Sequence, residues 1–187
     1  YLEPRASFAP QTAPYYLNLG DIRTGGRIER TDQQSIPWRV TIEPDYSDLG
    51  ASGVAPFLNG QALIRGGVRS IPDPDYSGEY VDVTLRLVPP NEAPVPGDVF
   101  VIGTFSNWEA RAENVMQWNS TEGWYEGVVS MKQGQHEYRY AASDPDFQQS
   151  LAAGAPQMQN LFTTFVYLND IARQTDRLVA VQGMLTR

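Results

Sequence analysis

Apolar and polar residues alternate most regularly at positions 79–88 of this 187-residue chain. Successive side chains of a β-strand point to opposite sides, so this alternation predicts a strand with one buried and one solvated face. The face expected to be buried carries Val81, Val83, Leu85 and Leu87, and the other carries Tyr80, Asp82, Thr84 and Arg86. A shorter stretch at 38–43 alternates in the same way and predicts a second strand.

A β-hairpin is predicted at 124–141, where two strand-like runs are joined by Lys132-Gln133-Gly134. Short connections that contain Gly are typical of hairpins. In the second run His136, Tyr138 and Tyr140 share one face, whereas Glu137 and Arg139 share the other. We expect the aromatic face in the core because it has the most apolar area to bury. The expected core residues are Val83, Leu85, Val101, Tyr138 and Tyr140.

Further strands are predicted at 160–167 and 176–182, while 44–53 and 143–157 are expected to be loops. No stretch predicts a helix convincingly. Residues 70–78 contain two Pro, two Asp and a Gly, which is typical of a linker. We therefore expect two β units, a smaller β-rich one at 1–75 and an antiparallel sandwich of seven or eight short strands at 76–187.

The central stretch resembles the glycogen-binding modules of AMP-activated kinase β-subunits and the related family 48 carbohydrate-binding modules. The resemblance rests on the run GQHEYRY at 134–140 and on Val99, Ile102, Gly103, Phe105 and Trp108. It covers roughly residues 80–167 and implies an immunoglobulin-like, early-set β-sandwich. A fold of this kind hosts many functions, so the resemblance alone does not decide what the chain does.

Nearly the whole chain is similar to the C-terminal half of the type IX secretion system plug protein family of Bacteroidetes-like bacteria. The stretches that carry this similarity are GDIRTG at 20–25, WRVTIEPD at 38–45, GEYVDV at 78–83, MKQGQHEYRY at 131–140 and DRLV at 176–179. The resemblance implies a periplasmic, outer-membrane-associated protein that closes or regulates a protein translocon. No signal peptide is visible in this chain, which does not begin with Met.

Composition narrows the classes of function. The formal net charge is −8 and the isoelectric point is about 4.6, so binding to nucleic acid, which needs a basic surface, is not expected. The chain has no cysteine, which excludes disulfides and thiol chemistry. No apolar run approaches the roughly 18 residues of a membrane-spanning helix, so the chain is not expected to span a membrane.

The sequence gives little support for catalysis or for a bound metal or cofactor. His136 is the one histidine, and a catalytic triad or metal site needs further partners. The Asp-Pro-Asp sequences at 73–75 and 144–146 lack the glycine and glutamate of the EF-hand calcium loop, and we interpret them as Asx-turns beside proline. We expect no enzyme activity, no metal site and no cofactor.

Two surfaces are candidates for binding. In the glucan hypothesis, Trp108 stacks on a sugar ring while Arg139 and Asn160 bond its hydroxyl groups, the positions that the resemblance implies. The second sugar-stacking Trp of those modules is missing, and Phe147 is the nearest ring. The alternatives are a Trp108 packed over the end of the sandwich and an Arg139 paired with a neighbouring carboxylate.

The leading hypothesis is a non-catalytic component of an outer-membrane secretion machine, with an outer-membrane translocon protein as its partner. Trp118 and Trp124 are its expected contact residues, because exposed aromatic groups anchor protein interfaces. The alternative is a module that binds α-glucans such as glycogen or starch. An enzyme is the weakest of the three hypotheses.

Overall fold

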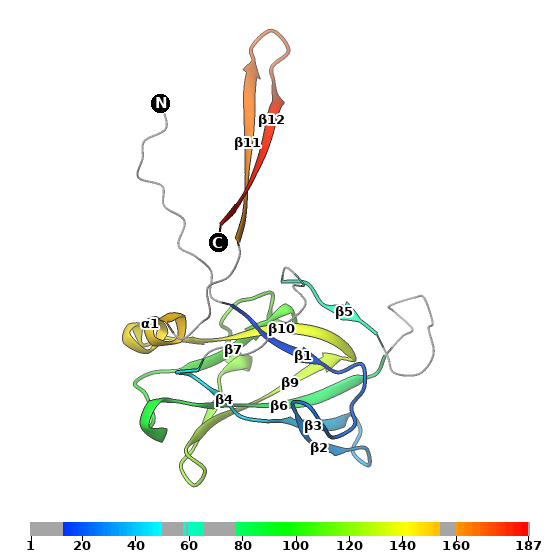
Figure 1. Ribbon diagram of the computed structural model, residues 1–187, viewed down its shortest axis with the longest axis vertical. Coiled ribbons are helices and arrows are strands. Elements are labelled where there is room, and N and C mark those ends of the chain that lie inside the picture. The colour runs from blue at the N-terminus through cyan, green and yellow to red at the C-terminus, as the bar shows by residue number, and fades with distance from the viewer. Residues whose placement is uncertain (1–12, 50–57, 59, 66–77, 154–159, 187) are drawn as a thin grey trace. The chain divides into compact units, whose positions relative to one another are not determined.

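The computed structural model describes residues 13–49, 58, 60–65, 78–153 and 160–186 (Figure 1). The chain divides into a body, Ala13–Pro156, and a second unit whose described part is a β-hairpin at 160–186.

The body consists of two facing β-sheets (Figure 1). In the first sheet, strand β10 is central and pairs with β1, β5 and β7. The strands of this sheet are β1 Tyr15–Asn18, β5 Leu63–Ile64, β7 Val99–Gly103 and β10 Gly134–Ala142. The second sheet has the strand order β2-β3-β6-β9-β8, and β4 also pairs with β6. Its strands are β2 Ile28–Asp32, β3 Trp38–Ile42, β4 Asp45–Tyr46, β6 Tyr80–Val88, β8 Gln117–Asn119 and β9 Trp124–Lys132.

The all-β, sandwich-like fold is confirmed, but the second sheet is mixed rather than wholly antiparallel. Strand β3 runs parallel to β6, with Val40 opposite Val83, and β4 also runs parallel to β6. Parallel neighbours need a long connection between them, and the 37 residues at 43–79 supply it. The predicted strands β6, β7, β9 and β10 are present, but the predicted hairpin is wrong: β9 pairs in the second sheet and β10 in the first, so the short connection at Gln133 carries the chain from one sheet to the other.

The core lies between the two sheets, and each predicted core residue is part of it. Val83, Leu85, Val101 and Tyr138 have no exposed surface, and Tyr140 is 5% exposed. Leu17 and Leu19 at β1, Ile42 from β3 and Met131 from β9 also lie in this core. The apolar face of the strand at 79–88 is therefore buried, as predicted. Arg86 is an exception, because it was expected on the solvated face and is buried.

The structure divides the chain differently from the predicted boundary between residues 75 and 76. Tyr15 of β1 pairs with Tyr138, and Trp38 of β3 pairs with Val81, so the first described strands belong to the same sandwich as the later ones. The linker expected at 70–78 lies outside the described residues except for Gly78. The strands predicted at 160–167 and 176–182 exist, as β11 Asn160–Asp170 and β12 Thr175–Thr186, but they pair with each other in the second unit.

Two segments expected to be loops contain regular structure. Residues 145–153 form helix α1, Pro145–Ala153, which Asp144 caps by accepting the Phe147 N–H at 2.9 Å. The Asp-Pro pair is thus the start of a helix, with the carboxylate as N-cap and proline in the first turn. A backbone N–H in the first turn has no partner within the helix, so the missing N–H of proline costs nothing there. The short strand β4 lies in the other segment. No helix in the described part of the chain is long and apolar enough to cross a membrane.

Candidate functional site

Trp108 lies in the loop after β7 and is held by contacts with its own chain. Its backbone φ is +63°, a conformation that is rare for a bulky residue. Its backbone N–H donates to the Gly103 carbonyl at 2.8 Å, and its indole Nε1–H donates to the Gly60 carbonyl at 2.9 Å. A Cβ added to Gly60 would lie 3.4–3.7 Å from three indole atoms, so the loop backbone is seated directly against the ring.

Glu137 and Arg139 meet Trp108 on the outer face of β10. Glu137 is 3% exposed, and its two carboxylate oxygens accept the backbone N–H groups of Leu58 and Gly60, each at 2.8 Å. The guanidinium carbon of Arg139 lies 5.4 Å from the centre of a Trp108 ring, within the range of a cation–π contact. Burial lowers the pKa of Arg139, and the nearby Glu137 charge opposes this effect. We call these residues, Leu58, Gly60, Trp108, Glu137 and Arg139, the Trp108 clamp.

Phe147, a further residue of the glucan hypothesis, does not join the Trp108 clamp. Phe147 is 5% exposed and belongs to the core of the body, because helix α1 turns its ring inward. Asn160 begins β11 in the second unit, and its side chain lies outside the described residues. The structure therefore brings Trp108 and Arg139 together and makes Phe147 a structural residue.

Trp118 and Trp124 occupy the strand pair β8–β9 but are only half-buried, not fully exposed. Trp118 packs against the core, and its ring lies 5.0 Å from that of Tyr125. The Arg86 guanidinium covers a Trp124 ring at 4.9 Å. These contacts explain why the Arg86 side chain is buried on the face expected to be solvated: its polar groups donate to the Ile42 carbonyl and to Glu29.

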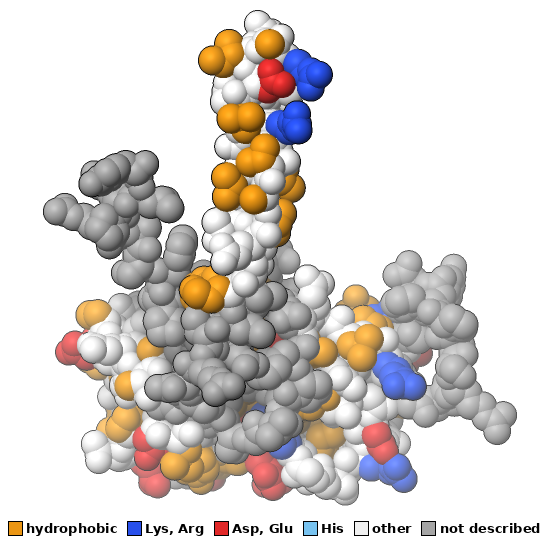
Figure 2. Space-filling view, turned by 45° about the horizontal axis from the view of Figure 1, so that its top comes forward, with side chains coloured by type: hydrophobic (Ala, Val, Ile, Leu, Met, Phe, Trp, Pro, Cys, Tyr) orange, Lys and Arg blue, Asp and Glu red, His pale blue; other side chains and the backbone are white. Residues whose placement is uncertain are grey.

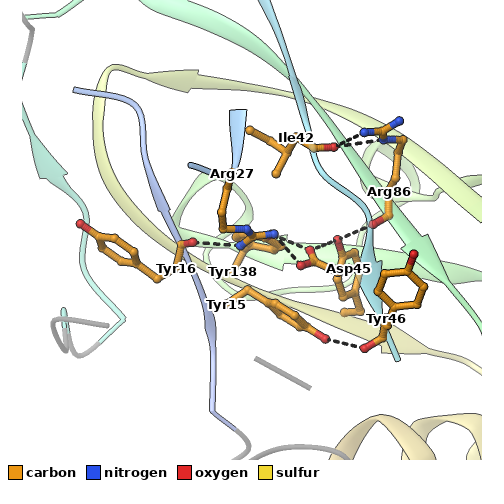
Figure 3. A network of polar contacts seen from close by, with 9 residues as sticks. Tyr15, Tyr16, Arg27, Ile42, Asp45, Tyr46, Arg86 and Tyr138 are labelled. Atoms are coloured by element: carbon orange, nitrogen blue, oxygen red, sulfur yellow. Dashed lines mark hydrogen bonds and ion pairs between the residues drawn. The ribbon is translucent and has the colours of Figure 1, made fainter. Parts of the chain in front are cut away.

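A buried polar cluster connects the two sheets (Figure 3). Asp45 accepts hydrogen bonds from the Tyr138 hydroxyl at 2.6 Å and from the Tyr140 hydroxyl at 2.7 Å, and it is paired with Arg27 at 2.5 Å. Arg27 also donates to the Tyr16 carbonyl at 2.9 Å and to the Tyr138 hydroxyl at 2.8 Å. We call Arg27, Asp45, Tyr138 and Tyr140 the Asp45 cluster.

The electrostatics of the Asp45 cluster favour a structural role. Burial raises the pKa of Asp45, while Arg27 and the two tyrosine hydroxyls oppose this effect. Burial and the Asp45 charge raise the pKa of Tyr138 and of Tyr140 well above the ordinary value. Both hydroxyls therefore stay protonated and act as fixed donors to the carboxylate. A tyrosine that acts as a nucleophile or general base would need a lowered pKa instead.

His136 is buried in the core, as its place on the aromatic face predicts. It is 3% exposed, and Nε2 donates to the Lys132 carbonyl at 2.6 Å, which leaves Nδ1 as an acceptor. Among the described residues Nδ1 has no hydrogen-bond partner. Burial lowers the pKa of His136, so the ring is neutral in the folded protein near pH 7. No group of three or more potential metal ligands occurs within the described ranges.

The solvated face of the second sheet has a shallow basin of about 1160 Å³. Arg30 and Arg39 line it beside Asp82 and Thr84. None of its described lining residues is aromatic, so the basin has no ring on which a sugar could stack.

Sequence patterns did not predict Glu137 or the Asp45 cluster. Alternation correctly places Glu137 opposite the core, but its carboxylate accepts the backbone N–H groups of Leu58 and Gly60, and nothing in the local sequence predicts that contact. Asp45 lies 93 and 95 residues from the tyrosines it joins, so no short-range spacing could reveal the cluster.

No family model matches the chain, and no curated protein matches it either. Among solved structures, the chain is similar to a hypothetical protein from Parabacteroides merdae ATCC 43184, with a TM-score of 0.70 and 24% identity. The alignment covers 96% of this chain but 46% of the other, so the chain spans about half the length of that protein. The likeness shows that the two share a fold.

Proposed function

We propose that this chain is a non-catalytic component of a bacterial outer-membrane protein secretion machine, which plugs or regulates the type IX translocon from the periplasmic side. The proposal starts from the family resemblance, which extends over residues 20–179 rather than over one module. It is also consistent with the chemistry of the body, where Asp45, Glu137 and His136 are all engaged in hydrogen bonds that hold the fold.

The Trp108 clamp is the observation that favours this proposal over sugar binding. Stacking on a sugar needs an open aromatic face beside groups that can bond hydroxyls. In the clamp, Arg139 lies over a Trp108 ring and the Gly60 backbone lies against the indole. Both oxygens of Glu137 already accept backbone N–H groups. The residues that a glucan would use are therefore engaged with the chain's own loop.

The surface around β8 and β9 is the proposed contact with the translocon. Trp124 lies on the outer face of this strand pair in contact with the Arg86 guanidinium, whereas Trp118 and Tyr125 share the face that packs on the core. Trp, Tyr and Arg are the residue types that most often dominate the energy of protein interfaces. The half-buried Trp124 ring is already in contact with Arg86, so it is a rigid contact: little side-chain entropy is lost when a partner covers its remaining surface.

The first test measures binding to the purified translocon barrel by surface plasmon resonance. We expect Trp124→Gln to weaken binding by about tenfold or more, as loss of an aromatic interface residue does. Tyr80→Ala is the matched control, because Tyr80 is 61% exposed on another strand of the same sheet. The comparison is valid only if both variants show a cooperative thermal unfolding transition like that of the unaltered chain. Absence of binding by the unaltered chain would refute the proposal.

The glucan alternative has one observation in its favour: Trp108 and Arg139 do lie together on one face of the body. Affinity electrophoresis in glycogen and calorimetry with maltoheptaose test it, and we expect no retardation and no heat. If the chain did bind glucan, Trp108→Ala would abolish binding while Trp108→Phe, which keeps a ring, would retain part of it. That pair of results would replace the secretion proposal with the sugar-binding one.

A further inference from the structure

The hairpin of β11 and β12 exposes large apolar side chains along most of its length (Figure 2). Phe165 is 54% exposed, Tyr167 is 60% exposed and Val181 is 56% exposed. The other exposed large apolar residues of the described hairpin are Val166, Leu168, Ile171, Leu178, Val179 and Met184. A two-stranded hairpin by itself is at best marginally stable in water. This one therefore needs a covering surface beyond its own two strands.

Both faces of the hairpin are apolar. Phe165 pairs with Val181 and Tyr167 pairs with Leu178, so these four side chains share one face. Val166 and Leu168 point to the other face. Strands that are apolar on both faces are typical of sheets covered on both sides, whereas a solvated sheet alternates between apolar and polar. The pattern thus belongs to an interior strand pair.

The hairpin also has two open edges. Within the described ranges, β11 and β12 pair only with each other, over 11 and 12 residues. Long open edges with apolar side chains pair readily with further strands, and proteins usually cover them. The turn end is different: Asn169 bonds Asp176 at 2.9 Å, and Asp170, Arg173 and Arg177 lie close by. With Ile171 as the apolar exception, this end is suited to water.

The comparison structure contains additional chain beyond the part that matches this one. The alignment with the Parabacteroides merdae protein leaves out 4% of the 187 residues, which is about seven, so it includes most of the hairpin. The aligned part is 46% of that chain, so more than half of that polypeptide lies beyond it. A polypeptide of this fold that carries the hairpin thus also carries enough additional chain for another domain.

We propose that the hairpin is completed by another domain of a longer polypeptide to which these 187 residues belong. That domain pairs a strand with a free edge of the hairpin and covers its apolar faces. A tethered domain has a high effective concentration, so it occupies the hairpin in preference to separate partners. This inference does not depend on the secretion proposal, because it concerns a different unit of the chain.

Hydrogen exchange tests the proposal by comparing the 187-residue chain with the polypeptide encoded by its complete reading frame. In the 187-residue chain we expect the amides of 162–184 to exchange freely, while those of β6 and β9 are protected. In the longer polypeptide we expect the hairpin amides to exchange at least about 100-fold more slowly. Phe165→Ser should reduce that protection, whereas Arg173→Ser at the turn should not.

Four results would overturn the proposal. The reading frame has no further domain, or the hairpin of the longer polypeptide exchanges as fast as that of the 187-residue chain. Alternatively, the hairpin is protected in the 187-residue chain in proportion to dimer measured by sedimentation, which assigns it to a second copy. Finally, protection that appears only when the purified translocon is added assigns the hairpin to that partner. Translocon or glucan binding by the body leaves the inference unaffected.

Discussion

Strand β6 of the body and strand β11 of the hairpin are both rich in apolar residues, but only one of them is covered. Val81, Val83 and Leu85 of β6 have no exposed surface, because the first sheet lies against them. Phe165 and Tyr167 of β11 are more than half exposed. The local pattern therefore predicts a strand in both places, while burial depends on a second layer that the pattern does not specify.

The same contrast separates the stability of the two units. In the body, apolar burial and the Asp45 cluster act across two sheets, so a change in one strand is felt by the whole unit. In the hairpin, the two described strands pair only with each other, and by the proposal above the stability of the hairpin depends on a covering domain. Four measurements test this contrast, from the largest expected effect to the smallest.

Val83→Asp is expected to unfold the body. It places a charge among fully buried apolar side chains, where no partner offsets the loss of hydration, at a cost of several kcal/mol. Val128→Asp is the matched control, because Val128 lies on the neighbouring strand and is 58% exposed. Circular dichroism melting checks both variants. A Val83→Asp protein that melts like the unaltered chain would show that the strand register is wrong.

Asp45→Asn is expected to lower the free energy of unfolding by about 2–4 kcal/mol, as loss of one partner of a buried ion pair does. The substitution leaves the Arg27 charge without its counter-ion and removes a strong acceptor from Tyr138 and Tyr140. Urea titration followed by tyrosine and tryptophan fluorescence measures the change. Asp21→Asn, which removes a solvent-exposed ion pair, should change the midpoint far less, and equal effects would contradict the structural role of the Asp45 cluster.

His136 is expected to make the body less stable as the pH falls below about 6.5. Burial lowers its pKa, so between the lowered folded value and 6.5 the unfolded chain binds more protons than the folded chain. The contribution of the neutral His136 to the free energy of unfolding is therefore fully present above pH 6.5, and it is lost as the pH falls from 6.5 toward the lowered pKa of the folded state. Urea midpoints from pH 7.5 to 5 measure the loss.

The control for this pH dependence is His136→Gln, which retains a side-chain donor for the Lys132 carbonyl but does not titrate. The chain has no other histidine, so the difference between the two pH profiles belongs to His136. Asp45, whose raised pKa acts in the opposite direction, is present in both proteins and cancels. Identical profiles would contradict the buried, neutral histidine.

Phe165→Ser in the 187-residue chain is expected to change the free energy of unfolding of the body by less than about 0.5 kcal/mol. The residue belongs to the second unit and is more than half exposed. The same variant should bind less of a dye that reports exposed apolar surface, whereas Thr164→Ser should not. A lower melting temperature of the body in Phe165→Ser would show that the two units are energetically coupled.

Local patterns predicted much of the body but not its long-range contacts. Strands β6, β9 and β10 follow from alternation and are present, but the short connection with Gly between β9 and β10 joins two sheets and does not form the expected hairpin. The parallel pairing of β3 with β6 has no such signal, because it joins residues about 40 positions apart. Helix α1 did have a local signal in the sequence, because Asp144 followed by Pro145 is typical of an N-cap and a first helical turn. We interpreted this pair as a turn.

The candidate site was predictable in part. The resemblance to carbohydrate-binding modules implied that Trp108 and Arg139 lie together, and they do. It did not predict that a loop about 50 residues earlier would bond the indole N–H, or that Glu137 would hold the same loop. Phe147 was placed on the surface because α1 was expected to be a loop, and a helix directs that ring into the core instead.

The position of β10 in the first sheet has a consequence for how the protein is made. Strands β1, β5 and β7 each pair with β10 and with no other strand of that sheet. Tyr15 precedes its partner Tyr138 by 123 positions, which is roughly 6–25 s of synthesis at about 5–20 residues per second. During that interval the three early strands have no central strand to join. A nascent chain that stops before residue 134 is therefore unable to assemble this sheet, however much of the other has formed.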